Sequence, residues 1–287
     1  MENSIEIKGL TCRYSNFALE NLYLTVPNGT VMGLIGENGA GKSTTIKAIL
    51  GLIKPESGSV TVLGEDSMKL SAAVKEQIGV VFDTLPFPAV LTAKQLDKVL
   101  KGTFKSWDST EYYNYLERFC LPADKKLGSF SRGMQMRLSI AAALSHHPKL
   151  LVLDEPTGGL DPVMRAEILD LLMDFIQDES HSILISTHIT SDLEHIADYI
   201  GFIHKGHLVF SEERNALKEK HRVLKCTDEE LKRIDPADII GMRRGRFSNE
   251  VLTTAGDKYP DIAQDIPSID ELMVYYVKDA DEWRDVF

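Results

Sequence analysis

The sequence predicts an α/β protein whose central sheet is parallel and is covered by helices on both faces. Short apolar runs at Leu150–Leu153 and Ser182–Ile185 have the length and composition of buried parallel strands. Apolar residues at helical spacing follow the first run, between Ile168 and Phe175. Strand and helix patterns that alternate in this way are typical of a parallel sheet between helices.

The remaining segments extend this pattern along the chain. The first thirty-five residues are predicted to be mainly β structure, and Ile200–Phe210 is predicted to be a hairpin. Residues 92–144 are predicted to be mostly helical, with Asp108 and Glu111 as a capping box. From about residue 221, short mixed runs alternate with charged loops, which indicates a small α+β unit. We therefore expect a main domain over 1–220 and an accessory domain over 221–287.

Composition excludes several classes of protein. The chain has 287 residues, is 43% hydrophobic and carries a formal net charge of −11, which disfavours non-specific nucleic-acid binding. No apolar run approaches the length of a membrane span. The three cysteines lie far apart in the sequence, which is typical of a reduced cytosolic chain rather than of a disulfide framework.

A glycine-rich segment between a strand and a helix is predicted to bind a nucleotide triphosphate. Gly36–Thr44 fits the pattern G-x-x-x-x-G-K-[ST], and the glycine spacing does not fit a dinucleotide-binding loop. Its glycines allow successive N–H groups to point at one anion, Lys42 supplies a charge, and the Ser43 hydroxyl can bind Mg²⁺. The expected ATP-binding residues of the segment are Gly36, Asn38, Gly39, Ala40, Gly41, Lys42, Ser43 and Thr44.

Two adjacent acids form the second candidate site. Asp154 and Glu155 follow the apolar run Leu150–Leu153 and precede Pro156. A carboxylate at the end of a strand beside a phosphate loop can hold Mg²⁺ through water, so Asp154 is a candidate metal residue. Glu155 points elsewhere and is the candidate base that polarises the attacking water.

Together with three further motifs, these segments resemble the ATP-binding-cassette (ABC) ATPases over residues 4–215. The motifs are Phe130–Gln135, Gly159–Pro162 and Ser186–His188. The resemblance implies a P-loop NTPase cassette with an N-terminal antiparallel β subdomain, a parallel core sheet and a helical subdomain over about 84–145. It also implies ATP hydrolysis, with Mg²⁺, by a homodimer or heterodimer that sandwiches ATP.

The resemblance also implies roles for single residues. Ser131, Arg132, Gly133 and Met134 are expected to contact the γ-phosphate held by the other subunit, although Arg132 and Met134 depart from the family's usual glycine and glutamine. Asp161 is expected to couple the two sites. His188 is expected to contact the γ-phosphate and help orient the attacking water, and so to take part in catalysis with Lys42 and Glu155. Tyr14 is expected to stack on adenine, with Phe17 as a competitor. Asp83 stands where the family usually has a glutamine that touches Mg²⁺, and Asp83 is expected to bind Mg²⁺ in its place.

By the same resemblance, the chain is expected to be the ATPase subunit of a membrane exporter. Such a subunit lies on the cytoplasmic face of the membrane, bound to a separate permease and to no nucleic acid. The stretch from Phe82 to Leu96 is expected to form the groove for the permease, with Pro86–Leu91 as an exposed apolar patch or as ordinary core. The alternatives are a soluble cassette ATPase of iron–sulfur assembly, translation or DNA repair, and a metabolic P-loop kinase.

Overall fold

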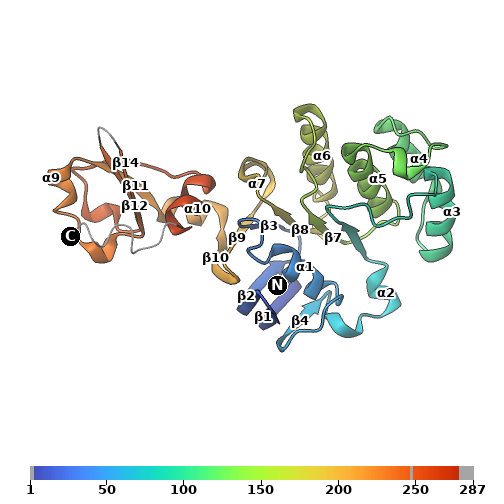
Figure 1. Cartoon of the computed structure of the whole chain (residues 1–287), viewed down its shortest axis with the longest axis horizontal. Coiled ribbons are helices and arrows are strands. Elements are labelled where there is room, and N and C mark those ends of the chain that lie inside the picture. Colours follow the sequence, from blue (N-terminus) through green and yellow to red (C-terminus); the bar gives the residue numbers. More distant parts are fainter. Residues whose placement is uncertain (1–2, 246–247, 278–287) are drawn as a thin grey trace.

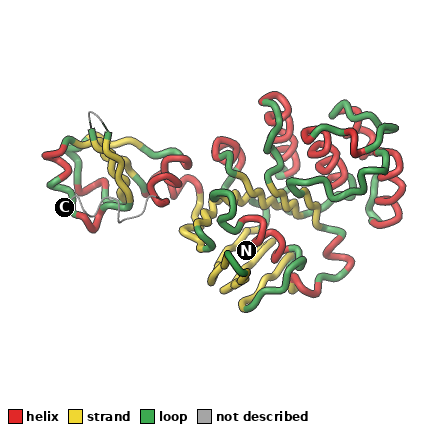
Figure 2. The backbone as a smooth tube through the Cα atoms, in the orientation of Figure 1, coloured by secondary structure: helices red, strands yellow, loops and turns green. Residues whose placement is uncertain are grey.

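The computed structural model describes residues 3–245 and 248–277, and it confirms the predicted α/β class (Figure 1). The C-terminal unit lies at one end of the long axis, and the helices of the predicted helical region lie at the other end (Figure 1). Figure 2 shows the strands of the central sheet between these two ends.

The N-terminal strands form an antiparallel sheet in the order β2-β1-β4-β5. Its alternating apolar residues, such as Ile5 and Ile7, share one buried cluster with Met32, Leu34 and Ile46. The predicted antiparallel β region is therefore present and packs against the start of the core sheet. The strands are β1 (Asn3–Tyr14), β2 (Phe17–Pro27), β4 (Ser57–Val62) and β5 (Glu65–Asp66).

The core sheet has the order β10-β9-β3-β8-β7-β6, and its neighbouring strands are parallel except for the β9–β10 hairpin. In the register of the sheet, Ile35 lies opposite Thr187 and Asp154 lies opposite Ser186. The segments that follow β3, β7 and β8 therefore meet at one edge of the sheet. The strands are β3 (Val31–Ile35), β6 (Ile78–Val81), β7 (Leu150–Asp154), β8 (Ser182–Thr187), β9 (Tyr199–His204) and β10 (His207–Glu213).

The predicted helical middle of the chain is confirmed. Asp108 begins one helix by accepting hydrogen bonds from the N–H groups of Thr110 and Glu111. The predicted capping box with Glu111 is wrong, because the N–H of Asp108 donates to the carbonyl oxygen of Ser145 instead. This region contains α3 (Ala93–Thr103), α4 (Ser109–Arg118) and α5 (Arg132–Leu144). The other helices of the first 220 residues are α1 (Lys42–Ile49), α2 (Ala72–Lys75), α6 (Pro162–Phe175), α7 (Thr190–Ile196) and α8 (Arg214–Lys220), with short 3₁₀ turns at Ser67–Lys69 and Leu127–Ser129.

The C-terminal unit has a separate antiparallel sheet in the order β12-β13-β11-β14 and a small core of its own. Its last helix packs instead on the main domain, where the ring centre of Tyr276 lies 5.4 Å from that of Phe210 on β10. Residues 278–287 of the predicted accessory domain lie outside the described residues. The elements are β11 (Arg222–Cys226), β12 (Gly241–Arg244), β13 (Asn249–Thr253), β14 (Ala263–Asp265), α9 (Asp228–Leu231) and α10 (Ile269–Val277), with 3₁₀ turns at Pro236–Asp238 and Gly256–Lys258.

Candidate nucleotide site

The glycine-rich loop joins the buried strand β3 to α1 and curls around the ammonium group of Lys42. Gly36 has no room for a side chain, because a Cβ atom there would lie 2.3 Å from the carbonyl oxygen of Ile203. Gly39 and Gly41 have φ angles of 83° and 123°, which other residues rarely adopt. Nζ of Lys42 donates to the carbonyl oxygen of Gly36 at 2.7 Å, and only 6% of this residue is exposed. A loop of this kind before a helix N-terminus favours a polyphosphate.

Ser43 and Asp154 meet where α1 begins and β7 ends. The Ser43 hydroxyl donates to Oδ2 of Asp154 at 2.9 Å, and the Ser186 hydroxyl donates to Oδ1. These oxygens fit Mg²⁺, which prefers oxygen ligands. Within residues 3–245 and 248–277, no group of three or more His, Cys, Asp or Glu side chains could hold a metal ion. Mg²⁺ here would therefore need phosphate oxygens and waters to complete its coordination.

Glu155 lies between two groups that can carry positive charge. Its Oε1 is 3.5 Å from Nζ of Lys42, and its Oε2 is 2.7 Å from Nδ1 of His188. The backbone N–H of Glu155 donates to the carbonyl oxygen of Ser186 at 2.9 Å, and its φ of 53° turns the chain sharply after β7. The carboxylate is thus held at a defined place beside the phosphate loop, where it can accept a proton from a water molecule.

A cavity of 510 Å³ is lined by the phosphate loop and by Asp154 and Glu155. Four carboxylates and one ammonium group are among its lining side chains, so the charged groups of the lining are mainly acidic. The lining residues are Asn16, Phe17, Glu37, Asn38, Gly39, Gly41, Lys42, Ser43, Thr44, Asp83, Asp154 and Glu155.

Several predicted residues lie at the rim of this cavity or outside it. Tyr14 is 52% exposed and does not line the cavity, whereas its cross-strand neighbour Phe17 does. His188 does not line the cavity, but it contacts the lining residue Glu155. Asn16 also lines the cavity, and it was not predicted because a lone asparagine in a hairpin turn carries no signal of nucleotide binding. The adenine-stacking role of Tyr14 stays a prediction.

The Ser131 motif begins α5 but does not line the cavity of its own chain. The Ser131 hydroxyl accepts a hydrogen bond from the N–H of Met134 at 3.3 Å and so caps the helix. A Cβ atom on Gly133 would lie 3.2 Å from Leu160, which places this helix end beside the loop after Glu155. Asp161 caps α6 in the same way, accepting from the N–H groups of residues 163 and 164 at 3.1 Å. The predicted contact of Ser131 with the nucleotide of a second chain stays a prediction.

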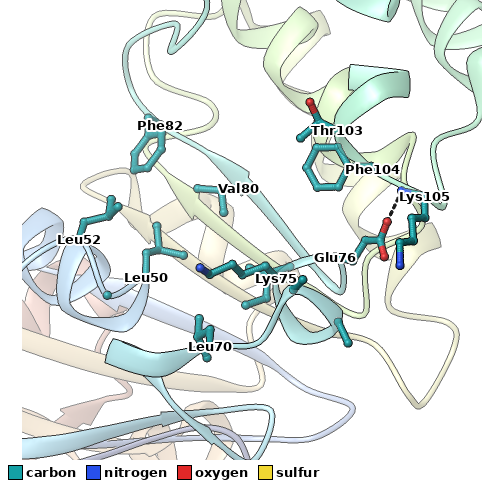
Figure 3. A pocket seen from close by; sticks show the side chains of 14 residues that line it. Leu50, Leu52, Leu70, Lys75, Glu76, Val80, Phe82, Thr103, Phe104 and Lys105 are labelled. Carbon is teal, nitrogen blue, oxygen red and sulfur yellow. Dashed lines mark hydrogen bonds between the residues drawn. The ribbon is translucent and has the colours of Figure 1, made fainter. Parts of the chain in front are cut away.

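A second, apolar groove of 740 Å³ lies between the core and the helical region. Figure 3 shows Leu50, Leu52, Val80 and Phe82 on one side and Phe104 on the other. Of the stretch expected to form a permease groove, only Phe82 is among its lining residues. The apolar residues within Pro86–Leu91 differ in exposure. Val90 is exposed, while Phe87 and Leu91 are half-buried and pack on the core.

In the part of the chain that the structure describes, no helix combines the length and apolar character needed to cross a membrane.

Comparisons with known proteins identify the family. The family model of the ABC transporters matches residues 19–158, and a model described as an AAA domain, a putative AbiEii toxin of a type IV toxin–antitoxin system, matches residues 126–191. The bacitracin transport ATP-binding protein BcrA of Bacillus licheniformis is 38% identical over 228 residues, covering 77% of this chain and 74% of that protein. The lantibiotic transport ATP-binding protein SrtF of Streptococcus pyogenes is 37% identical, covering 68% and 84%.

Solved structures show the same fold. An ATP-binding subunit of an ABC transporter superposes with a TM-score of 0.68 at 28% identity, covering 75% of this chain and 91% of that one. The dimeric cassette MJ0796 bound to ADP and phosphate has a TM-score of 0.65 at 24% identity, covering 73% and 98%, and supports the fold alone. The chain therefore belongs to the ABC transporter family and is an ATP-binding, ATP-hydrolysing subunit.

Proposed function

We propose that this chain powers the export of peptide antibiotics through a separate permease, by hydrolysing ATP between two cassettes. The main support for the hydrolytic step is the position of Glu155. Its carboxylate lies within 3.5 Å of Lys42 and 2.7 Å of His188, beside the paired oxygens of Ser43 and Asp154. A base, a cation and a metal-binding edge are the parts that phosphoryl transfer to water requires.

The phosphate loop and five side chains of the site have distinct tasks. The loop N–H groups and Lys42 bind and orient the β- and γ-phosphates. Ser43 and Asp154 would hold Mg²⁺, which when bound would neutralise charge on the phosphate oxygens. Glu155 accepts a proton from the attacking water, and His188 keeps the Glu155 carboxylate in place through the 2.7 Å contact.

The second cassette supplies the part that this cavity lacks. Ser131 to Met134 lie outside the cavity of their own chain, at the N-terminus of α5. A helix N-terminus with a serine hydroxyl favours an anion, so this end of α5 suits the γ-phosphate of a partner chain. Asp161 caps α6 and follows Leu160, which lies beside this end of α5, so Asp161 would connect the two sites. Two copies, or this chain with a related one, would then enclose two nucleotides.

The apolar groove is the proposed contact with the permease. It has an apolar floor that includes Leu50 and Phe82, and charged side chains at Lys75, Glu76 and Lys105. An amphipathic helix on the cytoplasmic side of a membrane protein fits such a surface, because its apolar face fills the floor and its polar face stays in water. The cassette would thus lie on the inner face of the membrane, with residues 221–287 as an accessory domain.

The proposed cargo and direction follow from the relatives. Two of them are named for transport of bacitracin and of lantibiotics, and both of these are peptide antibiotics. Export is the direction in which moving such a peptide protects the cell. The cargo need not touch the ATP-binding subunit, so nothing in the cavity has to recognise it.

The test begins with the membrane partner. The full chain, purified from its own membranes in mild detergent, should bring down one membrane protein, and the pair should raise the resistance of a sensitive bacterium to bacitracin or a lantibiotic. The matched control is the same pair with Glu155→Gln, which should bind the partner but give no resistance. Recovery without any membrane protein would favour a soluble cassette ATPase, and resistance that survives Glu155→Gln would rule out export driven by this site.

A further inference from the structure

An ion pair that has no role in the proposed function described above lies at the edge of the nucleotide cavity. Arg132, the first residue of α5, pairs through Nη2 with Oδ1 of Asp83, two residues beyond the end of β6. Asp83 lines the cavity of the same chain, whereas the neighbouring Ser131 does not. The pair therefore brings a guanidinium group from the helical region to the nucleotide site of its own subunit.

The Arg132 side chain is held at a second point as well. A Cβ atom on Gly159 would lie 3.6 Å from Cδ of Arg132, so the stem of this arginine runs over the glycine backbone after Glu155. The N–H of Gly158 donates to the carbonyl oxygen of Glu155 at 3.0 Å, which fixes that turn. Stem and guanidinium together keep the positive charge beside Asp83.

The cavity needs such a charge. Its lining has carboxylates at Glu37, Asp83, Asp154 and Glu155 but an ammonium group only at Lys42, among the described residues. ATP is itself strongly anionic, so each carboxylate without a partner opposes its binding. Asp154 accepts from two hydroxyl groups, Glu155 contacts Lys42, and Oε2 of Glu37 lies 3.7 Å from Nδ1 of His204. The remaining lining carboxylate, Asp83, is the one that Arg132 balances.

We propose that Arg132 acts within its own chain as a positioning residue that neutralises Asp83 and so preserves the affinity of the cavity for ATP. This inference rests on the proposed nucleotide site. Arg132 and Asp83 are also two of the positions at which the sequence departs from the usual motifs, and the contact joins them.

The pair is suited to a test because it contributes little to the fold. Arg132 is 60% exposed and Asp83 44% exposed, and exposed ion pairs contribute about 0–1 kcal/mol to stability. Substitution of either partner should therefore leave a folded chain. A change in nucleotide affinity then reports on charge at the cavity rather than on unfolding.

The experiment is a double-mutant cycle on the full chain, with equilibrium binding of ATP as the readout. We expect Arg132→Ala to raise the Kd for ATP about threefold to tenfold, less so at high salt. Asp83→Asn in the same chain should restore the Kd to within about twofold of wild type, because the uncompensated charge is then gone. Arg118→Ala is the matched control, since Arg118 pairs with Glu167 at 3.2 Å away from the cavity, and it should not change the Kd.

Binding is measured with and without Mg²⁺, which separates the proposal from two other roles. If Arg132→Ala changes only the turnover of the dimer and not the Kd, Arg132 acts on the nucleotide of the partner and the proposal is wrong. If Asp83→Asn weakens binding only with Mg²⁺ and does not rescue Arg132→Ala, Asp83 is a metal ligand and the proposal is again wrong. Failure of the wild-type chain to bind ATP would instead contradict the nucleotide site itself.

Discussion

The nucleotide cavity and the apolar groove lie in the same chain but are built in opposite ways. The cavity is polar and takes most of its residues from two short segments, 37–44 and 154–155, which meet because parallel strands end at one edge of the sheet. The groove is mainly apolar and takes its residues from four segments, 50–52, 70–76, 78–82 and 103–105. One surface is assembled by local motifs and the other by packing between the core and the helical region.

This difference predicts that the two surfaces can be changed independently. Chemistry needs a few polar atoms at fixed positions, so a single substitution in the cavity should remove it. Docking uses apolar area spread over several elements, so a single substitution in the groove should weaken it by a smaller factor. The following predictions test that separation in order of expected effect.

The largest expected effect is that of Glu155→Gln in the cavity. The amide cannot accept the proton of the attacking water, so turnover should fall by about 10²-fold to 10⁴-fold, whereas ATP should still bind. With hydrolysis blocked, the two-chain complex with ATP should accumulate. Phosphate release and size-exclusion chromatography with ATP measure the two results.

The control for this substitution is Glu37→Gln, which removes a carboxylate from the same cavity. Glu37 is 57% exposed and its Oε2 lies 3.7 Å from Nδ1 of His204, not beside Lys42. Turnover should therefore fall far less than in Glu155→Gln. Equal losses in the two variants would mean that the cavity responds to its total charge and that Glu155 has no special role as base.

The next effect is on stability, at a buried carboxylate behind the cavity. Asp192 is 1% exposed, and it accepts from the Thr157 hydroxyl at 2.7 Å and from Nε of Arg165. It thereby ties the loop after Glu155 to α6 and α7. Asp192→Ala leaves both donors without this partner, so the free energy of unfolding should fall by about 2 kcal/mol.

Urea unfolding measures this loss, and the exposed Asp170 on α6 gives the control. Asp170→Ala should change the free energy of unfolding by less than about 0.5 kcal/mol. If Asp192→Ala is as mild as the control, the loop after Glu155 is held by other contacts, such as the hydrogen bond from Gly158 to Glu155.

The contrast between the two surfaces also explains what could be predicted from the sequence. The phosphate loop and the Asp154–Glu155 pair were predictable because each is a local motif at the end of an apolar strand, and strand ends converge in a parallel sheet. The predicted helices and strands were confirmed for the same reason, since periodicity is a local signal. In the C-terminal unit, the helix Ile269–Val277 follows the same periodicity, because its buried residues Ile269, Leu272 and Tyr275 are spaced three apart.

The sequence contains no such local signal for contacts between distant segments. Arg132 and Asp83 lie 49 residues apart, and Asp192 lies 35 residues from Thr157, so no spacing rule connects them. The groove was expected within one stretch, Phe82 to Leu96, but most of its lining comes from other segments. Its shape depends on how the helical region packs on the core, which is a tertiary property that periodicity does not contain.

A moderate effect is expected from a charge placed in the groove. Leu52 is 60% exposed and lines the groove, so Leu52→Asp should leave the ATPase of the isolated chain unchanged and weaken capture of the membrane partner about tenfold. Val99→Asp is the control, because Val99 is 51% exposed on α3 but does not line the groove. An equal loss of capture in both variants would show that the partner binds elsewhere on the helical region.

The smallest effect separates the two aromatic residues at the entrance of the cavity. The Phe17 ring lies over the phosphate loop, since a Cβ atom on Gly41 would be 3.1 Å from its Cζ, whereas Tyr14 is 52% exposed and outside the lining. Loss of a stacked ring costs about 0.5–1.5 kcal/mol, so Phe17→Ala should raise the Kd for ATP about twofold to tenfold and Tyr14→Ala should raise it less.

Inorganic tripolyphosphate distinguishes stacking from damage to the loop, because it has phosphates but no base. If Phe17 stacks on adenine, Phe17→Ala weakens ATP binding and leaves tripolyphosphate binding unchanged. A loss for both ligands would mean that the ring supports Gly41 and the loop rather than the base. If Tyr14→Ala weakens ATP binding more than Phe17→Ala does and leaves tripolyphosphate binding unchanged, Tyr14 is the residue that stacks on adenine. The hairpin between β1 and β2 would then have to close over the cavity.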